Sequence, residues 1–182
     1  MTKAEIEQKL KDTLGAEKII WLPYGIYNDE TNGHIDNICA FTSETDVVLA
    51  WTDDENDPQY KLSSACLKAL ENSTTADGRK ITVHKLPLPK PVLITEHECE
   101  GLDTMDGLPT RTANERLAAS YVNFYISNGA IVMPFFNDKN DEIARNILAS
   151  LFPTREVIGV YARDILIGGG NFHCLTQQIP LS

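Results

Sequence analysis

The fold is decided by the apolar run Val47-Val48-Leu49-Ala50-Trp51 and the polar stretch behind it, Asp53-Asp54-Glu55-Asn56-Asp57. The same plan returns, at a constant offset of 84, as Ile131-Val132-Met133-Pro134-Phe135, followed by Asn137-Asp138-Lys139-Asn140-Asp141. Each copy joins a run typical of a buried strand to a polar turn that opens a helix. An internal period of this kind favours a repeat architecture, either closed around an axis or stacked in a row.

Each repeat is predicted to contain a strand, a turn, a second strand, a helix and a third strand. In the first copy we expect a hairpin over 38–42 and 46–52, a helix that begins at Asp57-Pro58, and a strand over 81–86. In the second copy the corresponding elements are expected over 121–126 and 130–136, in a helix opened by Asn140, and near 156–161. The sequence therefore predicts an α/β fold.

Both ends of the chain fit part of this repeat. Thr2 and Glu5 form a capping-box pattern before a helix expected over about 3–14, and a buried strand is expected over 18–22. A shift of 137 lays this helix and strand over the helix and last strand of the second copy. The chain is thus expected to open with the second half of a unit, and 168–180 to supply a loop and strand of another. Sheet edges left open in this way predict a partner or instability.

Composition and charge exclude several classes of function. The 182 residues include 16 Lys and Arg against 26 Asp and Glu, a net charge of −10, which disfavours nucleic acid and anionic membrane surfaces as partners. No apolar run approaches the roughly 18 residues of a membrane-spanning helix, and the amino terminus lacks the apolar centre of a secretory signal. We therefore expect a cytoplasmic protein, in which the four cysteines are free thiols.

One segment interrupts the repeats. Residues 87–116 are rich in Pro and Gly, contain several acidic side chains and show no sustained period. We predict an irregular insertion here, within a single partial domain that spans 1–182.

Two polar residues stand out at the predicted entrance to a strand. His34 and Asp36 are two positions apart, and the alternation of side chains along a strand would place both on one face, where a base and an acceptor could meet one small ligand. A strand-entry His and Asp that satisfy local backbone groups are the alternative. Glu30 and the freely turning Gly33 precede the pair, and favour a loop that directs several polar groups at one place.

A second candidate is the cysteine that follows three glycines, Gly168-Gly169-Gly170. The spacing matches no phosphate-binding loop, which leaves Cys174 as a candidate nucleophile after a flexible turn. The alternative is an inert buried thiol, which is how Cys39 and Cys66 are interpreted. A metal site made of His34, Asp36, His173 and Cys174 has no pair of metal-ligand spacing to support it, so no metal is expected.

The two candidate segments resemble the signatures of one family. Glu30-Thr31-Asn32-Gly33-His34-Ile35-Asp36-Asn37 and Gly168-Gly169-Gly170-Asn171-Phe172-His173-Cys174-Leu175-Thr176-Gln177-Gln178-Ile179-Pro180 look like motifs of the agmatine deiminases, in the bacterial-type peptidylarginine deiminase superfamily. Trp51-Thr52-Asp53-Asp54-Glu55 and Ala118-Ala119-Ser120-Tyr121-Val122-Asn123-Phe124-Tyr125 are also similar to plant-like members. The resemblance covers essentially the whole chain. It implies the pentein fold, a five-bladed α/β propeller of ββαβ repeats, present here in part.

The resemblance also implies roles for individual residues. Cys174 matches the nucleophile, His34 the general acid and base, and Asp36 a carboxylate that grips the guanidinium of the substrate. Glu30 is a further candidate for substrate contact, and Gly169 and Gly170 would let the backbone pass beside the ligand. The implied reaction is hydrolysis of agmatine to N-carbamoylputrescine and ammonia through a covalent cysteine thiouronium intermediate, in putrescine biosynthesis, without a cofactor.

The family match begins near the middle of the family's length, so a second guanidinium-binding Asp and a Glu have no counterpart here. The resemblance therefore implies that the chain needs an amino-terminal half or partner chain, with a homo-oligomer as a further possibility. Two alternatives stay open. One is a non-catalytic remnant or polyamine-binding subunit, which would bind agmatine without turnover. The other is an arginine or peptidylarginine deiminase, against which the acidic surroundings of Glu30 argue.

Overall fold

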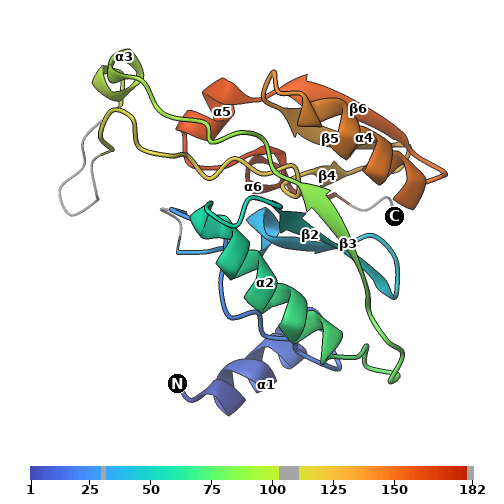
Figure 1. The fold of residues 1–182 in the computed structure, drawn as a ribbon. Helices are drawn as coiled ribbons and strands as arrows, with labels where there is room; N and C mark the ends of the chain where they lie inside the picture. The colour runs from blue at the N-terminus through green and yellow to red at the C-terminus, as the bar shows by residue number, and fades with distance from the viewer. Residues whose placement is uncertain (30–31, 103–110, 180–182) are drawn as a thin grey trace.

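The computed structural model describes residues 1–29, 32–102 and 111–179. Its main body consists of two units of the same kind, stacked one above the other in Figure 1. The first unit contains β1 (Cys39–Phe41), β2 (Asp46–Trp51), α2 (Pro58–Glu71) and β3 (Thr82–Pro87). The second contains β4 (Tyr125–Ile126), β5 (Ala130–Phe135), α4 (Asn140–Leu151) and β6 (Glu156–Tyr161).

The two units share one topology. Each forms a three-stranded sheet, in the order β1-β2-β3 or β4-β5-β6. The first two strands of each sheet are antiparallel, and the helix returns the chain so that the third strand lies parallel to the second. The parallel ladders begin at Asp46↔Thr82 and at Ala130↔Glu156. Because Asp46 and Ala130 stand at the predicted offset of 84, the repeat is confirmed.

The inner strand of the first unit is buried on both faces. Helix α2 packs against β2 and β3, and a single apolar cluster extends from Val47 and Leu49 to Met133 and Leu148 of the second unit. Val47, Val48, Leu49 and Ala50 are all 0% exposed. This double coverage explains why the strand reads as a continuous apolar run without alternation.

Polar contacts join the units where β3 ends. The Asn140 side chain donates to the Leu88 carbonyl at 2.7 Å, which ties the start of α4 to the first unit. Arg116 pairs with Asp57 at 2.7 Å, and Asp57 also caps α2 by accepting from the Gln59 amide at 2.9 Å. The Asn140 bond therefore joins the two units, and the Arg116 pair holds the segment over 87–116 against the first unit.

Helix α1 (Lys3–Leu14) begins and ends where the sequence predicts. Thr2 and Glu5 form the capping box, and Gly15 ends the helix with φ 67°, in the left-handed region that glycine adopts most easily. The bounds of α1 and α4 differ by the predicted shift of 137. Unlike α4, α1 has no buried residue.

Three predicted strands are wrong in whole or in part. Residues 18–22 form no strand, although Ile20 and Leu22 pack against the core. The described part of the chain offers this segment no neighbouring strand, and a ladder requires one. Of the strand expected over 121–126, only Tyr125 and Ile126 pair. The strand expected within 168–180 is replaced, as far as Ile179, by the short helix α6 (Phe172–Leu175).

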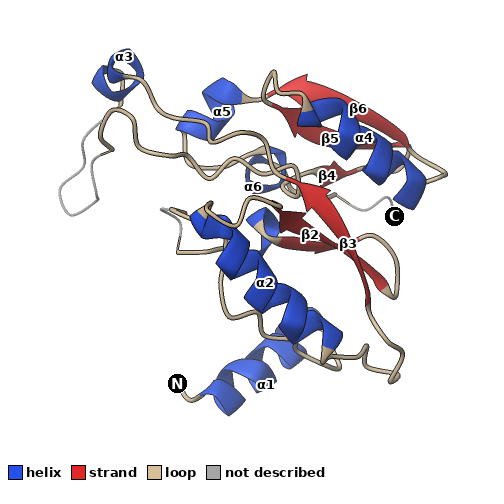
Figure 2. Ribbon diagram, in the orientation of Figure 1, coloured by secondary structure: helices blue, strands red, loops and turns tan. Residues whose placement is uncertain are grey.

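The predicted insertion over 87–116 falls partly on 103–110, outside the described residues, and stays a prediction. Its two described arms meet at a bridge between Leu93 and Arg116, and its outer end carries the short helix α3 (Glu96–Glu100) (Figure 2). Arg163 of α5 (Arg163–Ile167) holds α3, because its guanidinium donates to both Glu98 carboxylate oxygens at 2.6 and 2.8 Å. No helix in the described ranges is long and apolar enough to cross a membrane.

The Glu98–Arg163 pair predicts a pH-dependent stability. Hydrogen bonds from Arg163 lower the pKa of Glu98 from 4.5 to about 2. A carboxyl whose pKa is depressed in the folded state stabilises the fold above its unfolded pKa, and that contribution disappears as the pH falls through the folded pKa. We expect Glu98→Gln to lower the free energy of unfolding by about 1 kcal/mol at pH 7. This difference should shrink below pH 4.5 and vanish near pH 2, within the window set by the shifted pKa.

Urea unfolding of both proteins at several pH values measures this difference. Glu100→Gln is the matched control, because the Glu100 side chain is 72% exposed and its ion pair with His97, at 3.7 Å, is local. A Glu98→Gln difference that stayed constant down to pH 2 would contradict the interpretation.

Candidate active site

The candidate cysteine lies on α6, between the two units in Figure 1. Helix α6 begins after Asn171, and Cys174 is its third residue. Its backbone is held to the second unit, because the His173 and Cys174 amides donate to the Asn123 side-chain oxygen at 3.0 and 3.4 Å. Cys174 is exposed, whereas Cys39 and Cys66 are buried in the core as predicted, and all four cysteines are free thiols.

Asp36 comes from the first unit and meets Cys174 at this place. The Cys174 thiol donates to Asp36 Oδ2 at 3.2 Å, and His173 Nδ1 lies 3.0 Å from the same oxygen. The Asp36 side chain is 13% exposed. Among the described residues, its other oxygen, Oδ1, is buried without a hydrogen-bond partner. The fold thus brings together two residues 138 positions apart in the sequence.

The geometry predicted for His34 and Asp36 is wrong in one respect. Residues Ile35–Asn37 form a 3-10 helix, with His34 at its N-cap, so strand alternation does not set their directions. His34 is exposed, and its backbone amide donates to Asp29 Oδ2 at 3.1 Å. In the described chain, the imidazole that contacts Asp36 is that of His173. The third candidate of this loop, Glu30, lies outside the described residues.

The glycines before α6 make room for the cysteine. Gly169 has φ 98°, a backbone conformation that residues with a side chain rarely adopt. A Cβ on Gly170 would lie 2.7 Å from Cys174 Cβ and 3.0 Å from its Sγ. Gly170 is therefore needed where Cys174 folds back against the loop.

Burial and charge act together on the thiol. Although Cys174 as a whole residue is exposed, partial burial of its thiol raises the pKa, and the Asp36 carboxylate raises the pKa further. Hydrogen bonds from the Asn171 backbone and the Asn123 amide oppose this rise in pKa. In this arrangement the thiol stays protonated, and its S–H group donates a hydrogen bond to Asp36. A cationic ligand beside Asp36 would change this balance, because it neutralises the carboxylate and favours the thiolate.

His173 and Asn123 lie in segments that resemble the family, but the sequence assigned neither of them a role in the proposed site. Asn123 is 0% exposed and donates to Cys174 Sγ at 3.1 Å and to Asn37 Oδ1 at 3.1 Å. Their contacts could not be predicted, because these contacts join segments far apart in the sequence. Within the described ranges, no group of three His, Cys, Asp or Glu side chains is placed to hold a metal ion.

Comparisons with known proteins identify the family. The model described as Porphyromonas-type peptidyl-arginine deiminase matches residues 1–180, and the chain belongs to this family. A curated relative from Latilactobacillus sakei, named for agmatine deiminase, is 59% identical over 180 residues, which are 99% of this chain and 49% of the relative. A relative from Listeria monocytogenes with the same kind of name is 55% identical, over 99% of this chain and 50% of its own length.

Solved structures agree with this assignment. The agmatine deiminase of Enterococcus faecalis matches with a TM-score of 0.93 and 38% identity, over 99% of this chain and 49% of that one. A cysteine-to-serine variant of the C. jejuni agmatine deiminase was solved with substrate bound. It matches with a TM-score of 0.75 and 32% identity, over 95% of this chain and 45% of that one. The fold is a pentein-type α/β propeller, present here in part. The chain spans about half the length of the curated relatives it matches.

Proposed function

We propose that this chain carries the cysteine-containing part of an agmatine deiminase, which hydrolyses agmatine to N-carbamoylputrescine and ammonia. The observation that carries the proposal is the contact of Cys174 Sγ with Asp36 Oδ2 at 3.2 Å, because it joins the two segments that resemble the family's motifs. The names of the relatives support agmatine as the substrate. The C. jejuni protein, which holds its substrate when a cysteine is replaced by serine, supports a cysteine in the chemistry.

The proposed reaction uses the thiolate as a soft nucleophile. Cys174 Sγ bonds to the central guanidinium carbon, and the C–N bond to one terminal nitrogen breaks as His34 supplies the proton that ammonia carries away. Water then adds to the carbon of the thiouronium intermediate while His34 takes its proton. Cleavage of the C–S bond returns the sulfur and releases N-carbamoylputrescine, the product that would feed putrescine formation.

Asp36 is proposed to grip the substrate cation. A guanidinium donates through a planar fork, and a carboxylate binds it best with two oxygens free to accept. Asp36 has one buried oxygen, Oδ1, without a partner among the described residues, and its Oδ2 faces the thiol. Glu30 is proposed as a further substrate contact. Gly169 and Gly170 are proposed to let the backbone pass close to the ligand.

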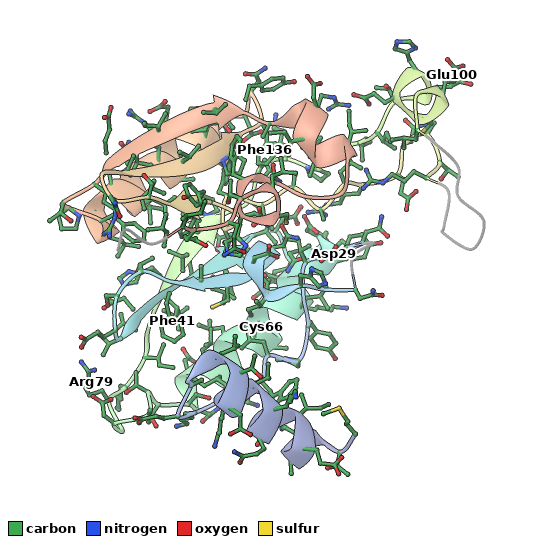
Figure 3. All side chains as sticks on the ribbon, turned by 180° about the vertical axis from the view of Figure 1, so that it is seen from behind. Asp29, Phe41, Cys66, Arg79, Glu100 and Phe136 are labelled. Atoms are coloured by element: carbon green, nitrogen blue, oxygen red, sulfur yellow. The ribbon has the colours of Figure 1, made fainter. Side chains whose placement is uncertain are left out.

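We propose further that the site needs polypeptide from outside this chain. An open groove of about 840 Å³ lies between α1, residues 16–22 and β1, and its lining includes Ile20, Leu22, Cys39 and Phe41. Figure 3 shows Phe41 and Arg79, which also lines the groove, on one side of the molecule next to α1. The described residues that line this groove include none of the candidate catalytic residues. Because the lining is mostly apolar, we propose that the groove is a surface for packing.

The repeat indicates which kind of polypeptide segment binds in the groove. In both complete units, the third strand pairs in parallel with an inner strand. The inner strand β2 lies between β1 and β3 in its sheet, and Val47 and Val48 are 0% exposed. By the shift of 137, residues 18–22 correspond to a third strand, and the groove lies beside them. We propose that an apolar hairpin from the amino-terminal half of a relative fills it, with its inner strand parallel to 18–22.

Variants of two exposed aromatic residues test this interface. Phe41→Asp places a charge in the groove at a side chain that is 52% exposed, so the folded chain tolerates it. We expect it to weaken binding of the amino-terminal half of the Latilactobacillus sakei relative at least tenfold, measured by analytical ultracentrifugation. Tyr161→Asp is the matched control, since Tyr161 is 51% exposed and lies on β6, outside the groove lining. If both variants weakened this binding equally, the groove would not be the binding surface. If the chain alone formed a dimer that Phe41→Asp abolished, the occupant of the groove would be a second copy of this chain. Either result would refute the proposed occupant.

Turnover assays separate the alternatives of function. We expect ammonia and N-carbamoylputrescine from agmatine only when both halves are present, and no comparable turnover of arginine. Turnover by the chain alone at the roughly 1–10³ s⁻¹ typical of enzymes would show that the site is complete without a partner. If calorimetry showed that agmatine binds, but neither the chain alone nor the two halves together turned it over, a polyamine-binding subunit would be favoured. Preference for arginine or a peptidylarginine would identify a different deiminase.

A further inference from the structure

We propose that Gln59 is a positioning residue for His34. Its buried side chain holds the loop over 24–33, here called the His34 loop, against helix α2, and His34 follows directly after this loop. The structure describes 24–29 and 32–33 of the loop. The inference rests on the proposed function only for the role of His34 in the chemistry.

The buried face of α2 becomes polar toward the start of the helix. Its buried residues are Gln59, Ser63, Cys66 and Leu70, at the spacing of one helical face. Gln59 and Ser63 are both 0% exposed. Buried polar side chains are uncommon and cost free energy unless they are hydrogen-bonded. Apolar residues would suffice for packing, so this pair indicates a task other than packing.

The His34 loop is closed at its base. A Cβ on Gly25 would lie 2.5 Å from Gly33 Cα, so the two ends of the loop touch through their backbones. The His34 amide also donates to Asp29 Oδ2 at 3.1 Å, which ties His34 to the loop. A shift of the loop is therefore expected to shift His34 with it.

Helix α2 holds this closed loop through its buried face. The Tyr27 amide donates to Gln59 Oε1 at 2.5 Å. Two helical turns further along the same face, the Cys66 thiol donates to the Tyr24 carbonyl at 3.2 Å. The Gln59 bond is the one nearer to His34 in the sequence, so it bears most directly on the position of the imidazole.

Ser63 determines which way the Gln59 amide points. The Ser63 hydroxyl donates its single hydrogen to the Ala50 carbonyl of β2 at 2.7 Å, so it can only accept from Gln59. Gln59 Nε2 donates to this hydroxyl at 2.9 Å, which leaves Oε1 to face the Tyr27 amide. A continuous path of hydrogen bonds thus runs from the inner strand of the sheet to the His34 loop.

The position of His34 matters because proton transfer depends on distance. A general acid must lie within about 2.6–3.2 Å of the atom that it protonates. A displacement of about 1 Å, caused by a change far from the reacting atoms, can lower a rate about 100-fold. His34 is exposed and its backbone is held through the loop, so we expect Gln59 to affect the reaction through His34 without touching the substrate.

The experiment compares Gln59→Leu with the unchanged full chain by NMR. Leucine has a similar volume but accepts no hydrogen bond, so the Tyr27 amide loses its acceptor. We expect this amide to exchange with solvent at least tenfold faster. The chain has four histidines, so each imidazole signal can be assigned by replacing one histidine at a time. We expect the His34 signal to shift, and the His84 signal, which reports on β3 of the same unit, to stay unchanged.

Two further variants complete the test. Gln8→Leu is the matched control, because Gln8 is exposed on α1 and its side chain bonds locally, to Asp12 at 2.8 Å. It should change neither signal. Ser63→Ala removes the group that orients the Gln59 amide, and should give a smaller change in the same direction. If Gln59→Leu fails to fold, Ser63→Ala decides the question.

A folded Gln59→Leu variant with an unchanged His34 signal would overturn the inference. Faster exchange spread evenly over both units would also overturn it, because a purely structural role predicts that result. In the assembled halves we expect Gln59→Leu to lower kcat at least tenfold, with a smaller change in KM. If the assembled halves never hydrolyse agmatine, the proposed function fails, and the NMR measurements still decide whether Gln59 positions His34.

Discussion

Replacing Cys174 by serine is expected to abolish agmatine hydrolysis by the assembled halves, with a loss of at least about 1000-fold in kcat. A hydroxyl is a much poorer nucleophile than a thiolate toward a delocalised cation. Asp36 Oδ2, which lies 3.2 Å from the sulfur of Cys174, also disfavours removal of the proton from a serine hydroxyl at this position. Release of ammonia and N-carbamoylputrescine measures the loss. Agmatine binding, followed by calorimetry, should survive, because the substitution leaves the Asp36 carboxylate in place.

The control for this experiment is Cys99→Ser. Cys99 lies on α3, at the outer end of the segment over 87–116, and is half-buried. Its replacement should leave turnover within a factor of two. Residual activity above one tenth in Cys174→Ser would assign the nucleophile elsewhere. Equal losses in both variants would point to damage to the fold.

Replacing Asp141 by alanine is expected to destabilise the fold by about 3 kcal/mol or more. The Asp141 carboxylate is 6% exposed and accepts from the Tyr121 hydroxyl at 2.6 Å, the Phe136 amide at 3.0 Å and the Asp138 amide at 3.1 Å. Its removal leaves the buried Tyr121 hydroxyl and the two amides without this acceptor. Burial raises the pKa of the Tyr121 hydroxyl, and its hydrogen bond to Asp141 raises the pKa further. The tyrosine therefore stays neutral and continues to need an acceptor.

Urea unfolding at pH 7 measures this loss, with two matched variants. Tyr121→Phe removes only the hydroxyl and should cost about 1 kcal/mol. Glu142→Ala removes the neighbouring acid, which is exposed and forms a local ion pair with Arg145. A surface change of this kind should alter stability by at most about 0.5 kcal/mol. A loss below about 1 kcal/mol in Asp141→Ala, the size of one ordinary hydrogen bond, would show that these three bonds do not hold the second unit together.

The units of the fold were predictable because their signals are local. Apolar runs the length of a strand, the N-cap Asp57 and the capping box at Thr2 each act within a few residues. Because the pattern occurs twice, the elements predicted in one copy support the elements predicted in the other. One of the predictions that failed, a strand over 18–22, had an equally clear apolar run. Local pattern shows that a segment can be a strand, but backbone pairing requires a neighbour, and the described chain supplies none.

The site was predictable only in part, for the same physical reason. Cys174 and Asp36 could be singled out because glycines and motif residues surround them. That they meet, with Sγ and Oδ2 3.2 Å apart, depends on how the two units pack. Asn123 lies in a segment similar to plant-like members of the family, but nothing in the sequence shows what it contacts. It became visible only through its bonds to Asn37 and Cys174.

The sequence by itself determined the ββαβ repeat, the acidic character of the chain and the family, because these follow from spacing, composition and motifs along the backbone. Tertiary structure alone decided which imidazole contacts Asp36, how the Asn123 amide is oriented, and where the open groove lies. Hydrogen bonds and packing act over a few ångströms in space, whatever the distance in sequence. The partners of Cys174 therefore depend on the docking of the two units.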